Sequence, residues 1–469
     1  MDLFFGLDQD GPEKPANHAN QANQASQANQ ASPAGPPAGP FDFQPRLVYR
    51  EESDKLSLSG RPIRLLHASD WHLGRTIYRI RRRHEEQEKF LKWLSELVAE
   101  ENIEALLLAG DVFDSASPPV AAQRLYYDFL VQLKKTACRD VVIVAGNHDS
   151  AAFLSAPAQF LKSQRIHVVG DPEDPEKETL VLADAAGEPA LIVAAVPFLK
   201  DRFVRLSVEG ESPKDRDLSL AKGIQAHYEA VAAVARQRQA ELGGRVPIVA
   251  LGHLFAAGGK IAEGDGVRDL YAGPFGQIEA ESLPKLFDYL ALGHLHRAQK
   301  VGSETIRYCG SPMAMSFTES GEKSVTLVDL GGGGLAISLI PVPKFQELLR
   351  LKGDKAEILA KIEKLKAIGS TAWLEIVHSG QEILADPKGI FEESLAGGQM
   401  ELLAVIDEKV VQEFFLSQKP VKDLAQMTVL EVFENLLDQK GYQAQDRSEL
   451  IAAYQEIILA LAESGQAVD

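Results

Sequence analysis

Short apolar runs alternate with longer amphipathic stretches from Ile63 onward. Apolar runs of four to eight residues bounded by turn residues are typical of buried strands, and we predict strands at 63–68, 103–109, 141–145, 190–196, 246–251 and 289–292. Apolar residues at helical spacing predict helices at 84–101, 118–135 and 218–242. This alternation predicts a layered α/β domain over residues 61–341. Later strands near 306–309 and 324–330 lack intervening helices, so part of the sheet is expected to be antiparallel or mixed.

Three other regions have different patterns. Asn-Gln-Ala repeats and a Pro-Gly-Ala stretch begin the chain, and this composition predicts a disordered tail over residues 1–60. Residues 342–410 combine a charged helix with two strands and predict a small α+β module. Residues 425–469 predict a pair of amphipathic helices, whose apolar faces pack either on their own domain or on a partner helix pair.

Composition narrows the class of protein. The chain has 469 residues, enough for two or three domains, and a net charge of -18, so any contact with DNA requires a local basic patch. Its two cysteines, Cys138 and Cys309, are far apart, which favours a reducing, cytoplasmic compartment over a disulfide scaffold. The start lacks the basic segment of a signal peptide, and no apolar run approaches the ~20 residues of a membrane span.

Polar residues with metal-binding chemistry follow the predicted strands. Ligands gather at the carboxyl ends of parallel strands, where this chain places Asp70, His72, Asp111, Asn147, His148, His253, His294 and His296. Imidazole combined with carboxylate suits Mn²⁺, Fe or Zn²⁺. Seven of these residues, with His148 left over, fit two metals that share a bridging carboxylate. For Asp111 alone, a helix-capping role is the alternative. The isolated His67 and His167 are expected to be structural.

The motifs LHASDWHLGR, AGDVFDSASPP, VVIVAGNHDS and ALGHLHRAQ occur in this order. Their order and spacing resemble the calcineurin-like metallophosphoesterase family over residues 63–330, which implies a layered β-sandwich flanked by helices. Together with RYCGSPMAMSFTESGEKSV, they resemble more closely the SbcD family of bacterial nuclease subunits, relatives of the archaeal and eukaryotic double-strand-break repair nuclease. This second resemblance extends through the small module and the final helices.

The resemblance implies a role for each site residue. Asp70, His72 and His296 match the first-metal ligands, Asn147, His253 and His294 match the second-metal ligands, and Asp111 matches the bridge. His148 matches the histidine that assists at the phosphate. Asp114 stands where the archaeal and eukaryotic branch has histidine. We expect it either to orient His148 or a ligand histidine, or to cap a helix. We expect two divalent ions, Mn²⁺ in particular.

An arginine cluster offers the local basic patch. Residues 61–84 contain seven arginines and one acidic residue, Asp70. Guanidinium groups neutralise phosphates well, so we predict DNA contacts by Arg75, Arg79, Arg81, Arg82 and, beside a ligand motif, Arg297. The alternative is a helix start paired with Glu85, Glu86 and Glu88. No base-reading motif occurs, so sequence-specific binding is not expected.

The resemblance implies a nuclease subunit that acts on DNA ends and hairpins, as double-strand exonuclease and hairpin or single-strand endonuclease, in repair, recombination and replication. It implies an SbcC-like coiled-coil ATPase partner bound by residues 425–469, a capping role for residues 342–410, and homodimers formed by the helices after Pro119 and Asp149. The alternatives are a phosphatase or small-molecule phosphodiesterase on the same fold, and a metal-free scaffold.

Overall fold

The computed structural model describes residues 45–52, 63–78, 81–206, 210–244, 246–257, 278–279, 287–319, 321–331, 334–382, 384–409 and 451. The Asn-Gln-Ala repeats and the helical pair predicted at 425–469 lie outside the described residues, apart from residue 451. None of the helices in the described part of the chain is both long and apolar enough to cross a membrane.

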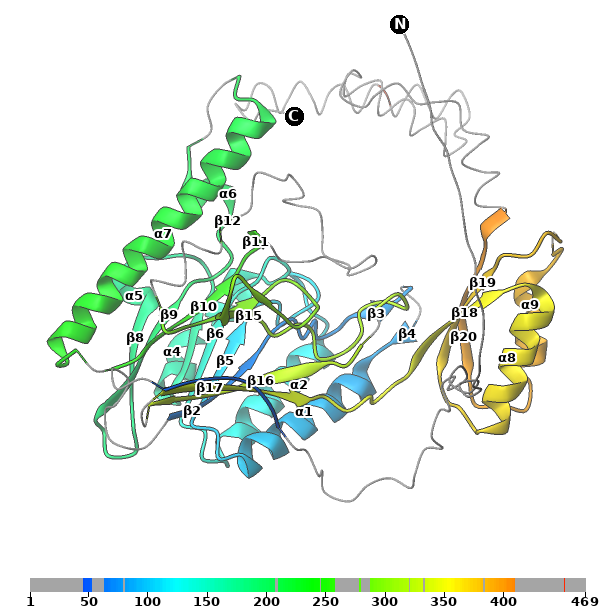
Figure 1. Ribbon diagram of the computed structural model, residues 1–469, viewed down its shortest axis with the longest axis horizontal. Coiled ribbons are helices and arrows are strands. Elements are labelled where there is room, and N and C mark those ends of the chain that lie inside the picture. Colours follow the sequence, from blue (N-terminus) through cyan, green and yellow to red (C-terminus); the bar gives the residue numbers. More distant parts are fainter. Residues whose placement is uncertain are drawn as a thin grey trace, which may run out of the picture. The chain divides into compact units, whose positions relative to one another are not determined.

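Two stacked sheets form the centre of the main domain (Figure 1). The first has the order β1-β17-β16-β2-β5-β6-β7, made of Arg46–Glu52, Gly334–Pro341, Ser324–Gly331, Ile63–Ala68, Ala105–Ala109, Asp140–Val144 and Ile166–Val169. The second has the order β14-β15-β13-β10-β9-β8, made of Gln299–Val301, Ser303–Tyr308, Tyr289–Gly293, Ile248–His253, Pro189–Ala195 and Thr179–Ala183. Strands β2, β5, β6 and β7 are parallel, as are β9, β10, β13 and β15, and the remaining pairs are antiparallel.

Side chains alternate between the two faces of each strand, so each sheet has a buried cluster on both of its faces. In β5, Ala105 and Leu107 face the second sheet and belong to the cluster between the sheets, whereas Leu106 and Leu108 pack under the helices. Strands buried on both faces read as continuous apolar runs, which is why these strands were predictable from the sequence.

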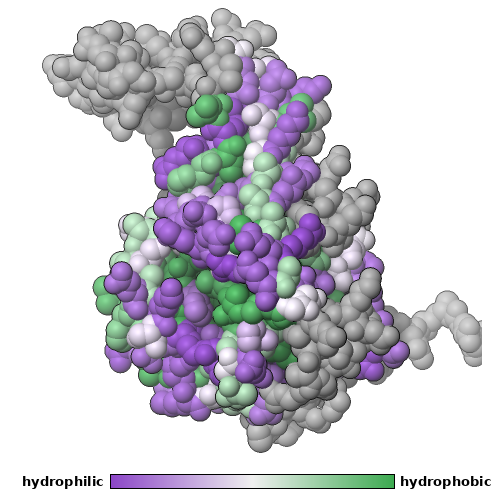
Figure 2. All heavy atoms as spheres, turned by 90° about the vertical axis from the view of Figure 1, so that its left-hand side faces the viewer, coloured by the Kyte–Doolittle hydropathy of each residue, from purple (hydrophilic) through white to green (hydrophobic). Residues whose placement is uncertain are grey.

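Helices cover the two outer faces. Helices α1 (His84–Glu100) and α2 (Val120–Leu133) pack on the first sheet, and α7 (Pro213–Glu241) packs on the second. Figure 2 faces α7 and shows mostly hydrophilic side chains over its exposed side. Four short helices complete the described part of this domain: α3 (Ala151–Ser155), α4 (Ala158–Ser163), α5 (Pro175–Glu178) and α6 (Asp201–Val204).

The small module has its own core. Its elements are β18 (Leu348–Gly353), α8 (Lys355–Ala367), β19 (Trp373–His378), α9 (Pro387–Ser394) and β20 (Glu401–Asp407), and its three strands are parallel. A capping box starts α8, in which Asp354 accepts from the Glu357 amide and the Glu357 side chain accepts from the Asp354 amide. The buried cluster of this module includes Ile358, Leu374 and Phe391.

Some elements differ from the prediction. Strand β1 lies at 46–52, inside the segment assigned to the tail, because its backbone pairs antiparallel with β17 while its side chains stay mostly exposed. Its low burial leaves little hydrophobic signal. Strands β7 and β8 were also not predicted. Two-residue ribbons pair β3 (Thr76–Ile77) with β4 (Arg81–Arg82), and β11 (Ala256–Ala257) with β12 (Ile278–Glu279).

Candidate metal centre

The predicted ligands meet where five strands end. Strands β2, β5 and β6 are parallel neighbours in the first sheet, and β10 and β13 are parallel neighbours in the second. Their carboxyl ends carry the residues predicted as metal ligands, and the structure brings together Asp70, His72, Asp111, Asn147, His253, His294 and His296.

The backbone is strained at several of these residues. Asp70, His72, Asp111 and His294 have φ angles of 54°, 46°, 49° and 101°. Non-glycine residues rarely adopt positive φ, and each such residue costs about 1–3 kcal/mol. Four strained residues in one buried cluster indicate that the surrounding structure aims these side chains at a common point.

Glycines allow the strand ends to approach one another. A Cβ at Gly293 would lie 1.8 Å from the Ala109 carbonyl oxygen, and one at Gly110 would lie 2.3 Å from His253 Nδ1. Gly110 also has a φ of 83°, which favours glycine. Both sheets therefore contribute ligands to one site because the chain has no side chain at these two contacts.

The first ligand cluster contains Asp70, His72 and His296, whose candidate ligand atoms lie within 4.8 Å of one another. The Nε2 atoms of His72 and His296 are 3.1 Å apart, and Nε2 of His72 is 3.6 Å from Asp111 Oδ2. Asp70 Oδ1 accepts from the His294 amide at 2.9 Å, and its Oδ2 accepts from Ser69 at 2.5 Å.

The second cluster surrounds Asn147. Its Oδ1 lies 2.9 Å from His253 Nε2 and 3.0 Å from His294 Nδ1. His253 donates through Nδ1 to the Ala109 carbonyl at 2.9 Å, which fixes the tautomer and leaves Nε2 as the inward nitrogen. Asp111 Oδ2 lies 3.4 Å from His253 Nε2 and 3.6 Å from His72 Nε2, so Asp111 faces both clusters.

The electrostatics of this site favour cations. Burial acts to raise the pKa of Asp111, but His253 and His72 outweigh it and hold that pKa well below its usual range. Burial acts to lower the pKa of His253, but Asp111 raises it to about 9. Burial lowers the pKa of His72, and it lowers that of His294 to about 3, so both rings are neutral. Carboxylates together with imidazoles are the donor set that binds divalent transition metals, and an ion at His253 would replace the proton that Asp111 favours there, so the residues present fit two such ions.

His148 and Asp114 lie beside the first cluster. The His148 amide donates to Asp111 Oδ1 and its ring Nδ1 donates to the Asp114 carbonyl, both at 2.9 Å. The Asp114 carboxylate lies 3.3 Å from His72 Nδ1 and accepts from Arg75 at 2.9 Å. Asp114 therefore contacts a predicted ligand histidine with its carboxylate and His148 with its backbone. Helix α2 begins at Val120 with Pro119 as its N-cap, so neither Asp111 nor Asp114 caps it.

Two acidic residues at the site were not identified from the sequence. The buried Asp149 carboxylate accepts from the amides of Val112, Phe113 and Gly146, at 3.1, 2.9 and 2.9 Å, and so holds two ligand loops together. Burial and the charge of Asp111 raise its pKa to about 6. Glu319 lies 3.8 Å from His296 Nδ1. Asp149 is the final residue of GNHD and Glu319 is the glutamate of SFTES. Neither residue belongs to a periodic pattern that would have predicted its position at the site.

The arginines predicted to contact DNA divide into three groups. Arg75 is largely buried and bound to Asp114 and to the Met315 carbonyl. Arg82 and Arg297 are exposed. Arg79 lies outside the described residues, and only the backbone of Arg81 is described. Arg83 forms a buried ion pair with Glu86. For this arginine, the structure agrees with the alternative prediction of a helix start paired with acidic residues.

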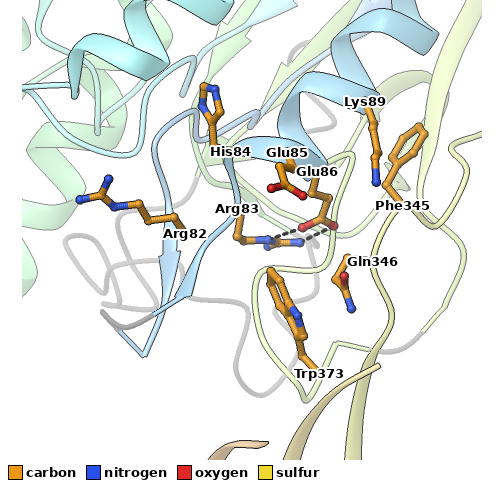
Figure 3. Close-up of a pocket in the computed structure, with 9 residues that line it drawn as sticks. All are labelled: Arg82, Arg83, His84, Glu85, Glu86, Lys89, Phe345, Gln346 and Trp373. Carbon is orange, nitrogen blue, oxygen red and sulfur yellow. Dashed lines mark hydrogen bonds and ion pairs between the residues drawn. The ribbon is translucent and has the colours of Figure 1, made fainter. Parts of the chain in front are cut away.

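The arginine cluster also borders the small module. A pocket of about 290 Å³ lies between Arg82–Glu86, Lys89, Phe345, Gln346 and Trp373. Figure 3 shows the Arg83–Glu86 pair facing Trp373, with Arg82 directed away from them. Next to it, Trp373 clusters with Ile77 and Phe317, and the Tyr78 hydroxyl donates to Glu375. The loop after the first ligand motif thus contacts the module directly.

Comparison with known proteins places these features in a family. The calcineurin-like phosphoesterase family matches residues 63–298, and a domain described as the type 5 capsule protein repressor C-terminal domain matches residues 344–441. The SbcD component of the SbcCD nuclease of Escherichia coli K12 is 34% identical over 80% of this chain and 92% of its own length. The proteins of the same name from Rhodobacter capsulatus and Bacillus subtilis are each 35% identical, over 65% and 58% of this chain and 76% and 67% of theirs.

Proposed function

This chain belongs to the calcineurin-like phosphoesterase family and, within it, to the SbcD components of the SbcCD nuclease, and on that premise we propose how its site acts. It is a metal-dependent phosphodiesterase, and its predicted fold class is confirmed. The substrate proposed is DNA, at ends and hairpins, cleaved as double-strand exonuclease and as hairpin or single-strand endonuclease.

The observation that carries the proposal is the convergence of seven ligands on one buried point. Five strand ends from two sheets supply them, and four of the seven accept a strained backbone there. A decayed scaffold would have no reason to retain this strain. Asp111 faces both clusters, as a bridging carboxylate does, and the two clusters suit divalent ions, for which we propose Mn²⁺.

Two divalent ions bound here would stabilise negative charge on the phosphodiester and lower the pKa of an attacking water. The protein groups do the positioning. Asp111 sets the spacing of the two clusters, and Asn147 contributes a neutral oxygen that limits the negative charge of the site. The Nδ1–H of His148 is held by the Asp114 carbonyl, so its Nε2 is the atom available to assist the leaving oxygen of the phosphodiester. Asp114 orients His72, with Arg75 as its counter-ion.

Exposed arginines and a predicted ATPase partner support DNA as the substrate. Exposed Arg82 and Arg297 are the described candidates for phosphate contacts, together with the predicted Arg79 and Arg81. The name of the relatives supports a complex with an SbcC-like coiled-coil ATPase, which we assign to residues 425–469, and the small module is proposed as a cap over the DNA path. Homodimerisation and a cytoplasmic location complete the proposal, the latter supported by the free thiols of Cys138 and Cys309.

The test compares two substrates with Mn²⁺ supplied. The full chain with its ATPase partner is expected to cleave a hairpin DNA and to prefer it strongly over a small phosphodiester such as bis-nitrophenyl phosphate. Exchange of Arg82 and Arg297 for Gln is expected to slow cleavage of DNA and leave the small diester unaffected. Equal rates on both substrates, unchanged by these substitutions, would reassign the chain to small-molecule phosphodiesterases.

A further inference from the structure

The segment Gly310–Glu319 runs beside the metal centre, and its role is not accounted for by the seven ligands. It contains Glu319, whose side chain is only 4% exposed although it is charged. Burying a carboxylate is costly unless hydrogen bonds or opposite charges compensate for it. One partner is Lys323, whose Nζ donates to Glu319 Oε2 at 2.6 Å.

The second oxygen of Glu319 faces a ligand. Glu319 Oε1 lies 3.8 Å from Nδ1 of His296, and His296 is 2% exposed. Both atoms are buried and make no hydrogen bond with the described residues. The other ring nitrogen of His296, Nε2, points to the first cluster, 3.1 Å from His72 Nε2. The imidazole thus lies between the metal cluster and a buried carboxylate.

From this geometry we propose that Glu319 is a positioning residue for the first metal ion, which holds His296 through the attraction between its carboxylate and the Nδ1–H that faces it. A carboxylate behind a ligand histidine fixes its tautomer, orients the ring and makes the metal-facing nitrogen more basic. The inference rests on the proposed two-metal function. His72 has the same arrangement through Asp114, so both histidines of the first cluster have a carboxylate behind them.

Lys323 makes this arrangement rigid. Besides Glu319, its Nζ donates to the His296 carbonyl at 3.0 Å and to Ser311 Oγ at 2.9 Å. The Ser311 amide in turn donates to the His296 carbonyl at 3.1 Å. Backbone and ring of His296 are therefore fixed by the same short segment. Two residues before Glu319, Phe317 packs in the cluster that contains Trp373 of the small module.

A purely structural role for Glu319, as the counter-ion of Lys323, is the competing explanation. The pair Glu178–His227 provides a matched control, because its carboxylate is 0% exposed, its imidazole is 2.8 Å away, and His227 belongs to α7 and is not among the predicted ligands. Glu178→Gln removes the same kind of carboxylate without affecting a ligand histidine.

The experiment is a calorimetric titration of the full chain with Mn²⁺. It compares the wild type with Glu319→Gln, Glu319→Ala and Glu178→Gln. We expect two binding steps in the wild type and in Glu178→Gln. In Glu319→Gln one step is expected to weaken about 10–100-fold while the other is unchanged, and Glu319→Ala is expected to weaken the same step further. Thermal unfolding of the metal-free proteins checks that all variants are folded.

The outcomes separate the two proposals. If the wild type binds two ions and Glu319→Gln binds both with wild-type affinity, the positioning role is wrong and the two-metal function stands. If both steps weaken equally in Glu319→Gln and in Glu178→Gln, the effect is general and the positioning role is again wrong. If the wild type binds no divalent ion, both proposals fail together.

Discussion

Replacing Gly293 by alanine tests whether the contact between the two sheets sets the geometry of the second cluster. The new Cβ would lie 1.8 Å from the Ala109 carbonyl oxygen and 2.9 Å from His253 Nδ1. Contacts of a Cβ below 3.0 Å are essentially not observed, so the two strand ends have to separate by about 1.2 Å at this point. The same carbonyl accepts the hydrogen bond that orients His253.

The expected cost follows from these two effects. Overpacking costs about 1–3 kcal/mol, and the loss of the His253 hydrogen bond adds about 1 kcal/mol, so Gly293→Ala is expected to destabilise the metal-free chain by about 2–4 kcal/mol. Because His253 loses its orientation, one of the two Mn²⁺ affinities is expected to fall about 10–100-fold. Urea unfolding and equilibrium dialysis measure these two quantities.

Gly223→Ala provides the control. Its Cβ would lie 2.1 Å from the Val204 carbonyl oxygen, an equally severe clash with backbone, on α7 and away from the predicted ligands. This variant is expected to keep both Mn²⁺ affinities whatever its stability. If Gly293→Ala also binds both ions with wild-type affinity, Gly293 does not position His253.

Three further outcomes are expected. Burial lowers the pKa of His67 from 6.5 to about 3, so the native state resists protonation of this ring. The unfolding free energy should therefore fall by up to about 1.4 kcal/mol per pH unit as the pH drops below 6.5. His67→Gln should remove this contribution to the pH dependence, measured by urea unfolding at several pH values. Asp149→Ala leaves three buried amides without their acceptor and should cost about 3–5 kcal/mol in metal-free urea unfolding; a loss under about 1 kcal/mol would contradict the assigned contacts. Trp373→Ala removes a ring packed on Ile77 and Phe317 and should cost about 3–5 kcal/mol, seen as faster hydrogen exchange in β19; unchanged exchange would mean that this cluster adds no stability.

Much of the fold was predictable because its strands are buried on both faces. The run Leu106–Ala109 has no polar position to interrupt it, and the Gly-Asp that follows marks its end. Strand β1 was missed because an edge strand is held by backbone hydrogen bonds, which leave no mark in the order of side chains.

The site was predictable to the extent that its residues lie in contiguous motifs. The seven predicted ligands each end or follow a strand, so the topology of the two sheets brings them together. Glu319 was not predictable because its contact with His296 depends on the path of a loop far from any ligand motif. Arg75 was predicted to contact DNA, yet its guanidinium binds Asp114, since a carboxylate lies within reach only in the folded chain.

Asp111 is proposed to bridge two metal ions, and electron paramagnetic resonance of the Mn²⁺-loaded full chain detects such a bridge. We expect two Mn²⁺ per chain with an exchange-coupled signal. Asp111→Ala should lose the coupling and at least one ion, whereas His148→Ala should keep both ions coupled and lose only cleavage. A wild-type signal from isolated, uncoupled Mn²⁺ would contradict the bridge, as would equal loss of metal in both variants.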